Sequence, residues 1–117
     1  MARITIVAWM PALLCVALAT GCRGRRIQGR CVQSGRCTEY YGKTKAELDA
    51  ARGVCRLFTG DEGWFEDGSS CPQEGLVGTC RIEGDGDVEI DHYYEGAYTP
   101  DEARTRCSEK NGTFEEA

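Results

Sequence analysis

Cysteine is the residue type with the most chemistry to offer in this chain, which contains eight cysteines among 117 residues. A cysteine can form a disulfide, ligate a metal or act as a nucleophile, and spacing and compartment favour one of these. Five residues separate Cys31 from Cys37 and eight separate Cys71 from Cys80, unlike the C-x2-C spacing of zinc sites, and no C-x-x-C redox motif occurs. We therefore expect structural disulfides, no metal site and no cofactor.

The first 21 residues have the layout of a secretory signal. They carry one charge, Arg3, followed by an apolar stretch over residues 4–19 and the small-residue run 19–21. A transmembrane helix needs about 20 predominantly apolar residues, and this stretch is shorter and contains Pro11. The pattern predicts a signal peptide over 1–21 that is removed from the mature chain.

The end of this segment, Leu18-Ala19-Thr20-Gly21-Cys22, resembles the lipobox of bacterial lipoproteins. In that motif the signal peptidase cuts before a cysteine that becomes diacylated, with a leucine usually three residues before it, where this chain has Ala19. The resemblance implies acylation of Cys22, palmitate among the acyl chains, and membrane lipid as a partner. It also implies a place in the cell envelope, the outer membrane rather than the inner. The alternative is ordinary cleavage that leaves Cys22 as a thiol.

The number of cysteines supports lipidation independently. Cys15 leaves with the signal, so seven cysteines would remain, and an odd number strands one thiol in an oxidising compartment. With Cys22 lipidated, six remain and can form three disulfides in any of fifteen pairings. The predicted disulfide cysteines are Cys31, Cys37, Cys55, Cys71, Cys80 and Cys107.

The mature chain has too few apolar residues to fold without help. Residues 22–117 contain only thirteen Leu, Ile, Val and Phe side chains, a content that would normally indicate disorder. Small secreted chains of this kind are stabilised by disulfides, each contributing about 2 to 4 kcal/mol. We expect the reduced chain to be unfolded.

Charge is divided unevenly along the chain. Residues 22–36 hold five arginines and no acid, whereas the rest holds eight basic residues against nineteen acids, a net charge of −11. We interpret residues 22–30 as a basic tether, either at an anionic membrane surface or as a solvated linker. The acidic domain over 31–117 argues against nucleic-acid binding, because phosphate contacts need a basic surface.

Two halves of the domain, about 31–70 and 71–117, repeat the same landmarks. Each half gives a cysteine pair, a tyrosine pair, a capping box, a single cysteine and a Gly-x-Phe sequence. The matched landmarks are Cys31 to Cys37 with Cys71 to Cys80, Tyr40-Tyr41 with Tyr93-Tyr94, Thr44 to Glu47 with Thr99 to Glu102, Cys55 with Cys107, and Gly63 to Phe65 with Gly112 to Phe114.

These landmarks predict the elements. The T-x-x-E sequences predict helices that start at Thr44 and Thr99 and end at Cys55 and Cys107. Residues 76–83 and 87–94 predict a hairpin around Gly-Asp-Gly. We expect an α+β fold, a small disulfide-stapled domain of two pseudo-repeats with two short helices packed on an antiparallel sheet. Three cysteines in each half require at least one bridge between the halves.

Other groups are weaker candidates for sites. The acids Glu83, Asp85, Asp87, Glu89 and Asp91 alternate with apolar residues, which indicates the solvated face of a strand, with calcium binding as the alternative. Each tyrosine pair should turn one ring inward and one outward, and an exposed aromatic patch for a protein or glycan is the alternative to a core role. The single histidine, His92, has no neighbouring nucleophile in the sequence, so we expect no catalytic residues.

The chain resembles small cysteine-rich lipoproteins of uncharacterised function from bacteria of the myxobacterial type. The residues that carry the resemblance are the lipobox at Cys22, residues 37–42, Cys71-Pro72 with residues 75–80, and residues 93–107. The expected function is that of a lipid-anchored, non-enzymatic binding or structural module of the cell envelope, with a possible protein or glycan partner. The alternative is an inhibitor of a cationic secreted enzyme such as a lysozyme or protease.

Overall fold

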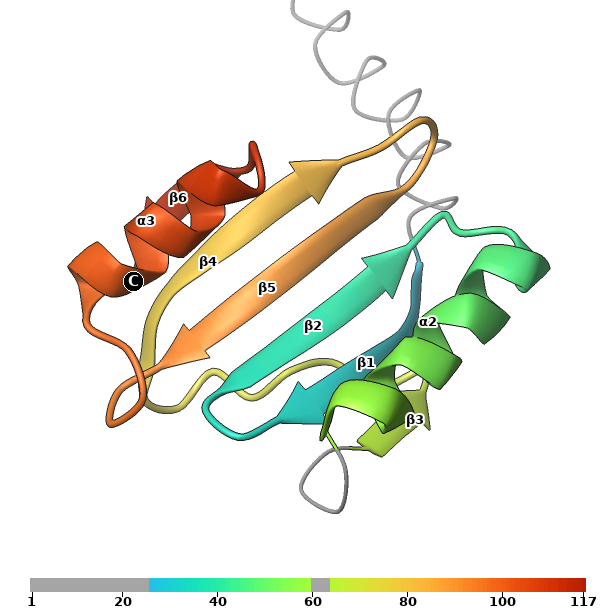
Figure 1. Cartoon of the computed structure of the whole chain (residues 1–117), viewed down its shortest axis with the longest axis horizontal. Coiled ribbons are helices and arrows are strands. Elements are labelled where there is room, and N and C mark those ends of the chain that lie inside the picture. Colours follow the sequence, from blue (N-terminus) through green and yellow to red (C-terminus); the bar gives the residue numbers. More distant parts are fainter. Residues whose placement is uncertain (1–25, 60–63) are drawn as a thin grey trace, which may run out of the picture.

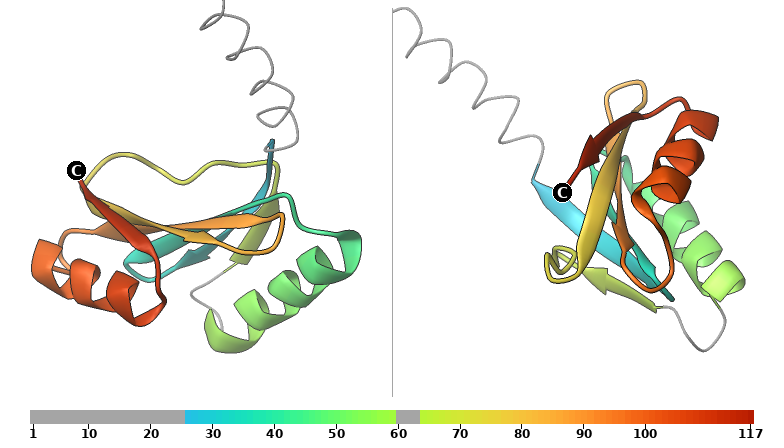
Figure 2. Two further views of the ribbon diagram at one scale, coloured as in Figure 1. Left: turned by 90° about the horizontal axis from the view of Figure 1, so that it is seen from above. Right: turned by 90° about the vertical axis from the view of Figure 1, so that its left-hand side faces the viewer.

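The computed structural model describes residues 26–59 and 64–117, which form an α+β domain with a single sheet. Its two helices cover one face of that sheet (Figures 1 and 2), as the sequence predicted. The strand order is β3-β1-β2-β5-β4-β6, and every neighbouring pair is antiparallel. The elements are β1 (Ile27–Gln33), β2 (Arg36–Tyr41), α2 (Lys45–Thr59), β3 (Trp64–Asp67), β4 (Leu76–Glu83), β5 (Val88–Tyr94), α3 (Pro100–Glu109) and β6 (Thr113–Glu116).

The sheet consists of two ββαβ units joined through β2 and β5. The first unit contributes β3-β1-β2 and the second contributes β5-β4-β6, so the strand order reads the same from either edge. In the register between β2 and β5, Thr38 pairs with Asp91, and the matched pairs Arg36 with Tyr93 and Tyr40 with Glu89 flank it on either side. A pseudo-twofold axis therefore passes through the pair formed by Thr38 and Asp91.

Corresponding side chains pack alike in the two units. A glycine in β1 and one in β4 leave room for a phenylalanine of the neighbouring edge strand, since a Cβ on Gly29 would lie 2.6 Å from Phe65 and one on Gly78 would lie 2.3 Å from Phe114. In each unit an arginine of the helix lies over this phenylalanine ring. Arg52 lies 5.2 Å from the centroid of the Phe65 ring, and Arg104 lies 5.1 Å from the centroid of the Phe114 ring.

Capping boxes start both helices, as predicted. Thr99 accepts from the backbone N–H of Glu102, and the Glu102 carboxylate accepts from the N–H of Thr99. Thr44 and Glu47 make the same two hydrogen bonds at the start of α2. These reciprocal bonds satisfy backbone donors that the first turn of a helix leaves unpaired.

The helix ends differ from the prediction. Each helix continues beyond its cysteine, α2 to Thr59 and α3 to Glu109. The predicted stop at Cys55 and Cys107 is therefore wrong, because a disulfide fixes a helical side chain without ending the backbone hydrogen bonds of the helix.

Disulfides take the place of a large apolar core. Of the ten apolar residues that are buried in the described part of the chain, six are cysteines, and the others are Tyr40, Val88, Tyr93 and Ala103. One apolar cluster lies under each helix: the first contains the bridge from β1 to α2 and the second the bridge from β4 to α3. The disulfides in these clusters explain why the chain folds despite its low apolar content.

Two boundary predictions need correction. Strand β1 begins at Ile27, so the last four residues of the predicted tether over 22–30 belong to the sheet and not to a linker. The repeated units occupy 27–67 and 76–116, and residues 68–75 connect them. The repeat also aligns Cys31 with Cys80 and not with Cys71, because Cys71 lies in the connection.

Candidate functional site

The connection over residues 68–75 crosses the sheet face opposite the helices (Figure 2) and covers a buried polar cluster. The cluster consists of Cys37 and Glu39 from β2, His92 from β5 and Cys71 from the connection. Cys37 and His92 are direct partners in the register of the two strands, and Glu39 follows two residues after Cys37 on the same face. All four residues are at most 5% exposed.

Glu39 is held by hydrogen bonds on both carboxylate oxygens. Its Oε1 accepts from the hydroxyl of Tyr41 at 2.6 Å, and its Oε2 accepts from the backbone N–H of Cys71 at 2.7 Å. His92 Nε2 lies 3.7 Å from the same Oε2. A buried carboxylate is tolerated only with such partners, so this glutamate fixes the connection to the sheet.

The orientation of His92 follows from its other ring nitrogen. Nδ1 lies 3.2 Å from the backbone carbonyl oxygen of Ile90. Because a carbonyl oxygen only accepts hydrogen bonds, Nδ1 carries the proton in this arrangement, and Nε2 is directed at Glu39. Imidazole and carboxylate thus face one another beside the sulfur of Cys71.

Two tyrosines at the edge of the cluster have raised pKa values. Burial, with the hydrogen bond to the Glu39 carboxylate, raises the pKa of Tyr41 well above its usual range. Burial, with the negative charge of Glu39, raises the pKa of Tyr94 to about 12, and the Tyr94 hydroxyl donates to the carbonyl of Pro72 at 2.7 Å. Both phenols are neutral donors at physiological pH and help to hold the connection in place.

The six predicted disulfide cysteines are all paired. Cys31 bonds to Cys55 and Cys80 bonds to Cys107, which ties each helix to its own unit. The third bridge joins Cys37 to Cys71 and links β2 to the connection between the units. The requirement for a bridge between the predicted halves is met by this third bond. The predicted lipidation site, Cys22, lies outside the described residues.

The interpretation of the alternating acids as a solvated face is wrong for the inner end of the run. Asp91 is only 1% exposed and lies on the helix side of the sheet. Its carboxylate accepts from Thr38 at 2.7 Å and from Lys110 at 2.6 Å. The helix face is packed at this point, so the strand turns these acids toward basic and hydroxyl groups instead of toward water.

Lys43 forms ion pairs with two further acids of the run, Asp87 and Glu89. Its ammonium group lies 2.6 Å from Asp87 and 3.0 Å from Glu89. Burial lowers the pKa of Lys43, but the hydrogen bonds to the two carboxylates outweigh it and leave the pKa raised. These acids therefore have lysine partners and do not converge on an ion.

The tyrosine pairs divide as predicted. Tyr40 and Tyr93 are buried on the helix side, while Tyr41 and Tyr94 lie on the opposite face. Burial, with the negative charge of Asp91, raises the pKa of Tyr93 to about 12. The inward rings are therefore core residues.

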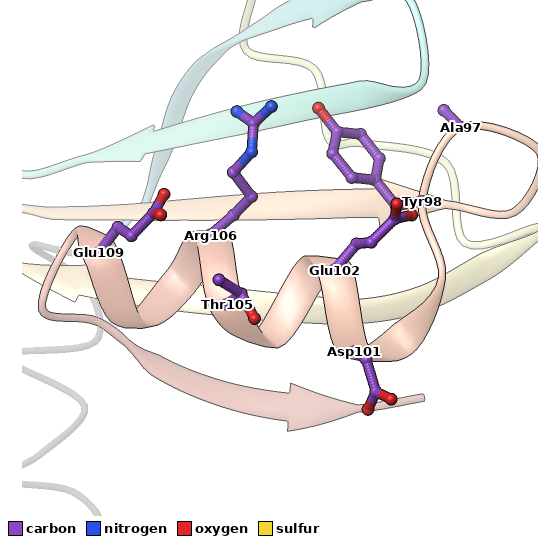
Figure 3. A pocket seen from close by; sticks show the side chains of 7 residues that line it. All are labelled: Ala97, Tyr98, Asp101, Glu102, Thr105, Arg106 and Glu109. Atoms are coloured by element: carbon purple, nitrogen blue, oxygen red, sulfur yellow. The ribbon is translucent and has the colours of Figure 1, made fainter.

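A cleft of about 370 Å³ runs along α3 on the helix side (Figure 3). Figure 3 shows Tyr98 and Arg106 on the same side of the helix, and the Arg106 guanidinium lies 5.8 Å from the centre of the Tyr98 ring. Tyr98 in turn packs edge-on against Tyr93 at 4.9 Å. Three carboxylates, from Asp101, Glu102 and Glu109, also line the cleft.

No family model, curated protein or solved structure matches the chain. Within residues 26–59 and 64–117, neither helix combines the length and the apolar character needed to cross a bilayer.

Sequence reasoning did not identify the polar cluster. Glu39 lies 32 residues from Cys71 and 53 from His92 in the chain, so no local motif joins them. The available signal was a charged residue, Glu39, directly before the tyrosine pair. The structure shows that residues on both faces of this strand are buried.

Proposed function

We propose that this protein is a lipid-anchored lipoprotein of the bacterial cell envelope, a non-enzymatic binding or structural module related to the cysteine-rich lipoproteins it resembles. The observation that carries the proposal is the disulfide pairing. Every cysteine after Cys22 is bonded to another one, so none remains as a partner for Cys22 once the signal is removed. A cysteine without a disulfide partner at the end of a lipobox supports acylation there.

The pairing also supports a place outside the cytoplasm. Three buried disulfides in a small domain persist where the environment is oxidising. The start of β1 at Ile27 leaves five residue steps from Cys22, a reach of at most about 18 Å. An anchored domain would thus be held close to the membrane surface.

The register of the strands indicates which end of an anchored domain would lie near the membrane and which would be its free end. One row across the sheet contains Ile27, Tyr41 and Val88, so β1 begins beside the turn between β4 and β5. The opposite end carries the turn between β1 and β2 and a cleft of about 310 Å³ that includes Pro72 and Tyr94. This free end is the surface we propose for a protein or glycan partner.

Mass spectrometry of the protein from membrane fractions tests the anchoring. We expect a mature chain that begins at Cys22 and carries a diacylglyceryl group, and a Cys22→Ser variant that leaves the lipoprotein processing pathway. Cys31→Ser is the matched control, because it removes a cysteine but leaves the lipobox intact. An unmodified Cys22 in a protein recovered from the soluble fraction would contradict the proposal.

The second candidate function is inhibition of a cationic secreted enzyme. The α3 cleft favours it, because its lining includes three carboxylates and one tyrosine ring against one guanidinium, which suits a lysine or arginine side chain of a partner. Inhibition of a lysozyme and of a trypsin-like protease is measured at low and at high salt. Salt-sensitive inhibition that Glu109→Gln weakens supports this function, and no inhibition at low salt removes it.

A further inference from the structure

We propose that reduction of the Cys37–Cys71 bridge converts the polar cluster into a zinc site with Cys37, Cys71, His92 and Glu39 as ligands. This goes beyond the proposed function, because it assigns a metal and a redox condition to a part of the molecule that anchoring does not use. Thiolate, imidazole and carboxylate are the donor types that zinc prefers.

The ligand atoms are already close together. One donor atom each from Glu39, Cys71 and His92 lies within 4.8 Å of the other two. Tetrahedral zinc, with bonds of about 2.0 to 2.3 Å, keeps its donor atoms roughly 3.3 to 3.8 Å apart. The 3.7 Å between His92 Nε2 and Glu39 Oε2 is within that range.

The surroundings also match those of a metal site. The bond from His92 Nδ1 to the Ile90 carbonyl leaves Nε2 as the donor atom, which is the usual arrangement of a metal-ligating histidine. The Tyr41 hydroxyl and the Cys71 N–H orient the Glu39 carboxylate in the same way. The Cys37 sulfur is not among the three converging donor atoms; it is bonded to that of Cys71, so opening the bridge would leave it beside the site as the fourth ligand.

The Cys37–Cys71 bridge differs from the other two in its surroundings. Cys31–Cys55 lies in a cluster with Tyr40 and Leu48, and Cys80–Cys107 lies in one with Tyr93 and Ala103. Opening either of those would expose sulfur to apolar neighbours. Opening the third places two sulfurs beside an imidazole and a carboxylate.

The redox step is balanced by a dithiol reductant. The dithiol supplies two electrons and two protons, the Cys37–Cys71 bond breaks to give two thiols, and the reductant becomes a disulfide. Zinc then displaces the two thiol protons and binds two thiolates, a neutral imidazole and a carboxylate. The metal would hold the connection to the sheet in place of the covalent bond.

The test needs a free thiol at this place with the other bridges intact. The expressed protein, solubilised in detergent, is prepared as a Cys37→Ala variant, which frees Cys71 and keeps Glu39 and His92. We expect one zinc per chain and, with cobalt(II) in its place, the visible absorption of tetrahedral cobalt and a thiolate charge-transfer band. The oxidised wild-type protein should show neither.

Two further variants identify the site. Cys37→Ala combined with His92→Gln should weaken zinc binding by at least about 100-fold, since it removes a direct ligand. Cys31→Ala is the matched control, because it frees Cys55 among apolar residues and should give no tetrahedral cobalt spectrum. Equal zinc binding by Cys37→Ala and Cys31→Ala, or no effect of His92→Gln, overturns the proposal.

A second measurement covers the case in which Cys37→Ala does not fold. The wild-type protein is then treated with one equivalent of a phosphine in the presence of zinc, species in which only the Cys37–Cys71 bridge is open are identified by mass spectrometry, and the metal bound per chain is compared with that of His92→Gln. Zinc uptake that His92→Gln abolishes supports the site. Uptake that is the same in both proteins, or none in either, refutes it, and neither result bears on acylation of Cys22.

Discussion

Replacing Thr38 with valine tests how much the hydrogen bond between Thr38 and Asp91, at the pseudo-twofold axis, stabilises the domain. The Thr38 hydroxyl donates to Asp91 at 2.7 Å, and the two residues are 5% and 1% exposed. Valine keeps the shape of the side chain and removes only the donor. A buried hydrogen bond to a charged group contributes about 1.5 to 3 kcal/mol, so the folded-to-unfolded ratio should fall by roughly 10-fold to 150-fold.

Urea unfolding of the oxidised protein measures this loss. With m between about 1 and 3 kcal/mol/M, the midpoint should fall by about 1 M with no change in m. Thr113→Val in β6 is the matched control, because that threonine is exposed. It should change stability by no more than about 0.5 kcal/mol.

A double-mutant cycle with Asp91→Ala, which removes the acceptor, separates the contact from other effects. Both single changes remove the same hydrogen bond between Thr38 and Asp91, so their effects should not add. The reasoning is refuted if Thr38→Val costs less than about 0.5 kcal/mol, the range of an ordinary surface change. Additive effects of the two substitutions would refute it as well.

Two other predictions concern packing and pH. Gly78→Ala should destabilise the domain by about 1 to 3 kcal/mol in urea unfolding, because its Cβ would overlap the Phe114 ring, whereas Gly53→Ala in the open middle of α2 should stabilise by about 0.5 to 1 kcal/mol. A Gly78→Ala variant that is as stable as Gly53→Ala would contradict the packing. Tyrosines with a native pKa near 12 should leave stability unchanged from neutral pH up to about pH 10 and should lower it between pH 10 and 12, because they keep their protons there while the unfolded chain loses them. Urea midpoints against pH, with phenolate absorbance, check this, and phenolate formation near pH 10 in the folded protein would contradict it. The tyrosines concerned are Tyr40, Tyr93 and Tyr94.

Much of the fold could be predicted from short stretches of the sequence. The capping boxes at Thr44 and Thr99 are formed by residues three positions apart, so their spacing alone fixes them. The same holds for the hairpin from Leu76 to Tyr94, where a Gly-Asp-Gly turn joins strands that pair directly. The division of each tyrosine pair follows from the twofold period of a strand.

Contacts between distant residues could not be predicted in this way. The six cysteines allowed fifteen pairings, and the register of the strands selected one by placing Cys31 and Cys80 under the helices and Cys37 under the connection. The buried position of Asp91 depends on Lys110 and Thr38, which come from other elements.

Composition and local spacing were enough to predict the class of fold, the number of disulfides and the repeat. Long-range contacts were needed to establish which cysteines pair, that the acids of β5 turn inward, and that Glu39 lies beside His92 and Cys71. This is because tertiary contacts join residues 24 to 53 positions apart, and a one-residue change of strand register would move the side chains of β2 and β5 to the other face.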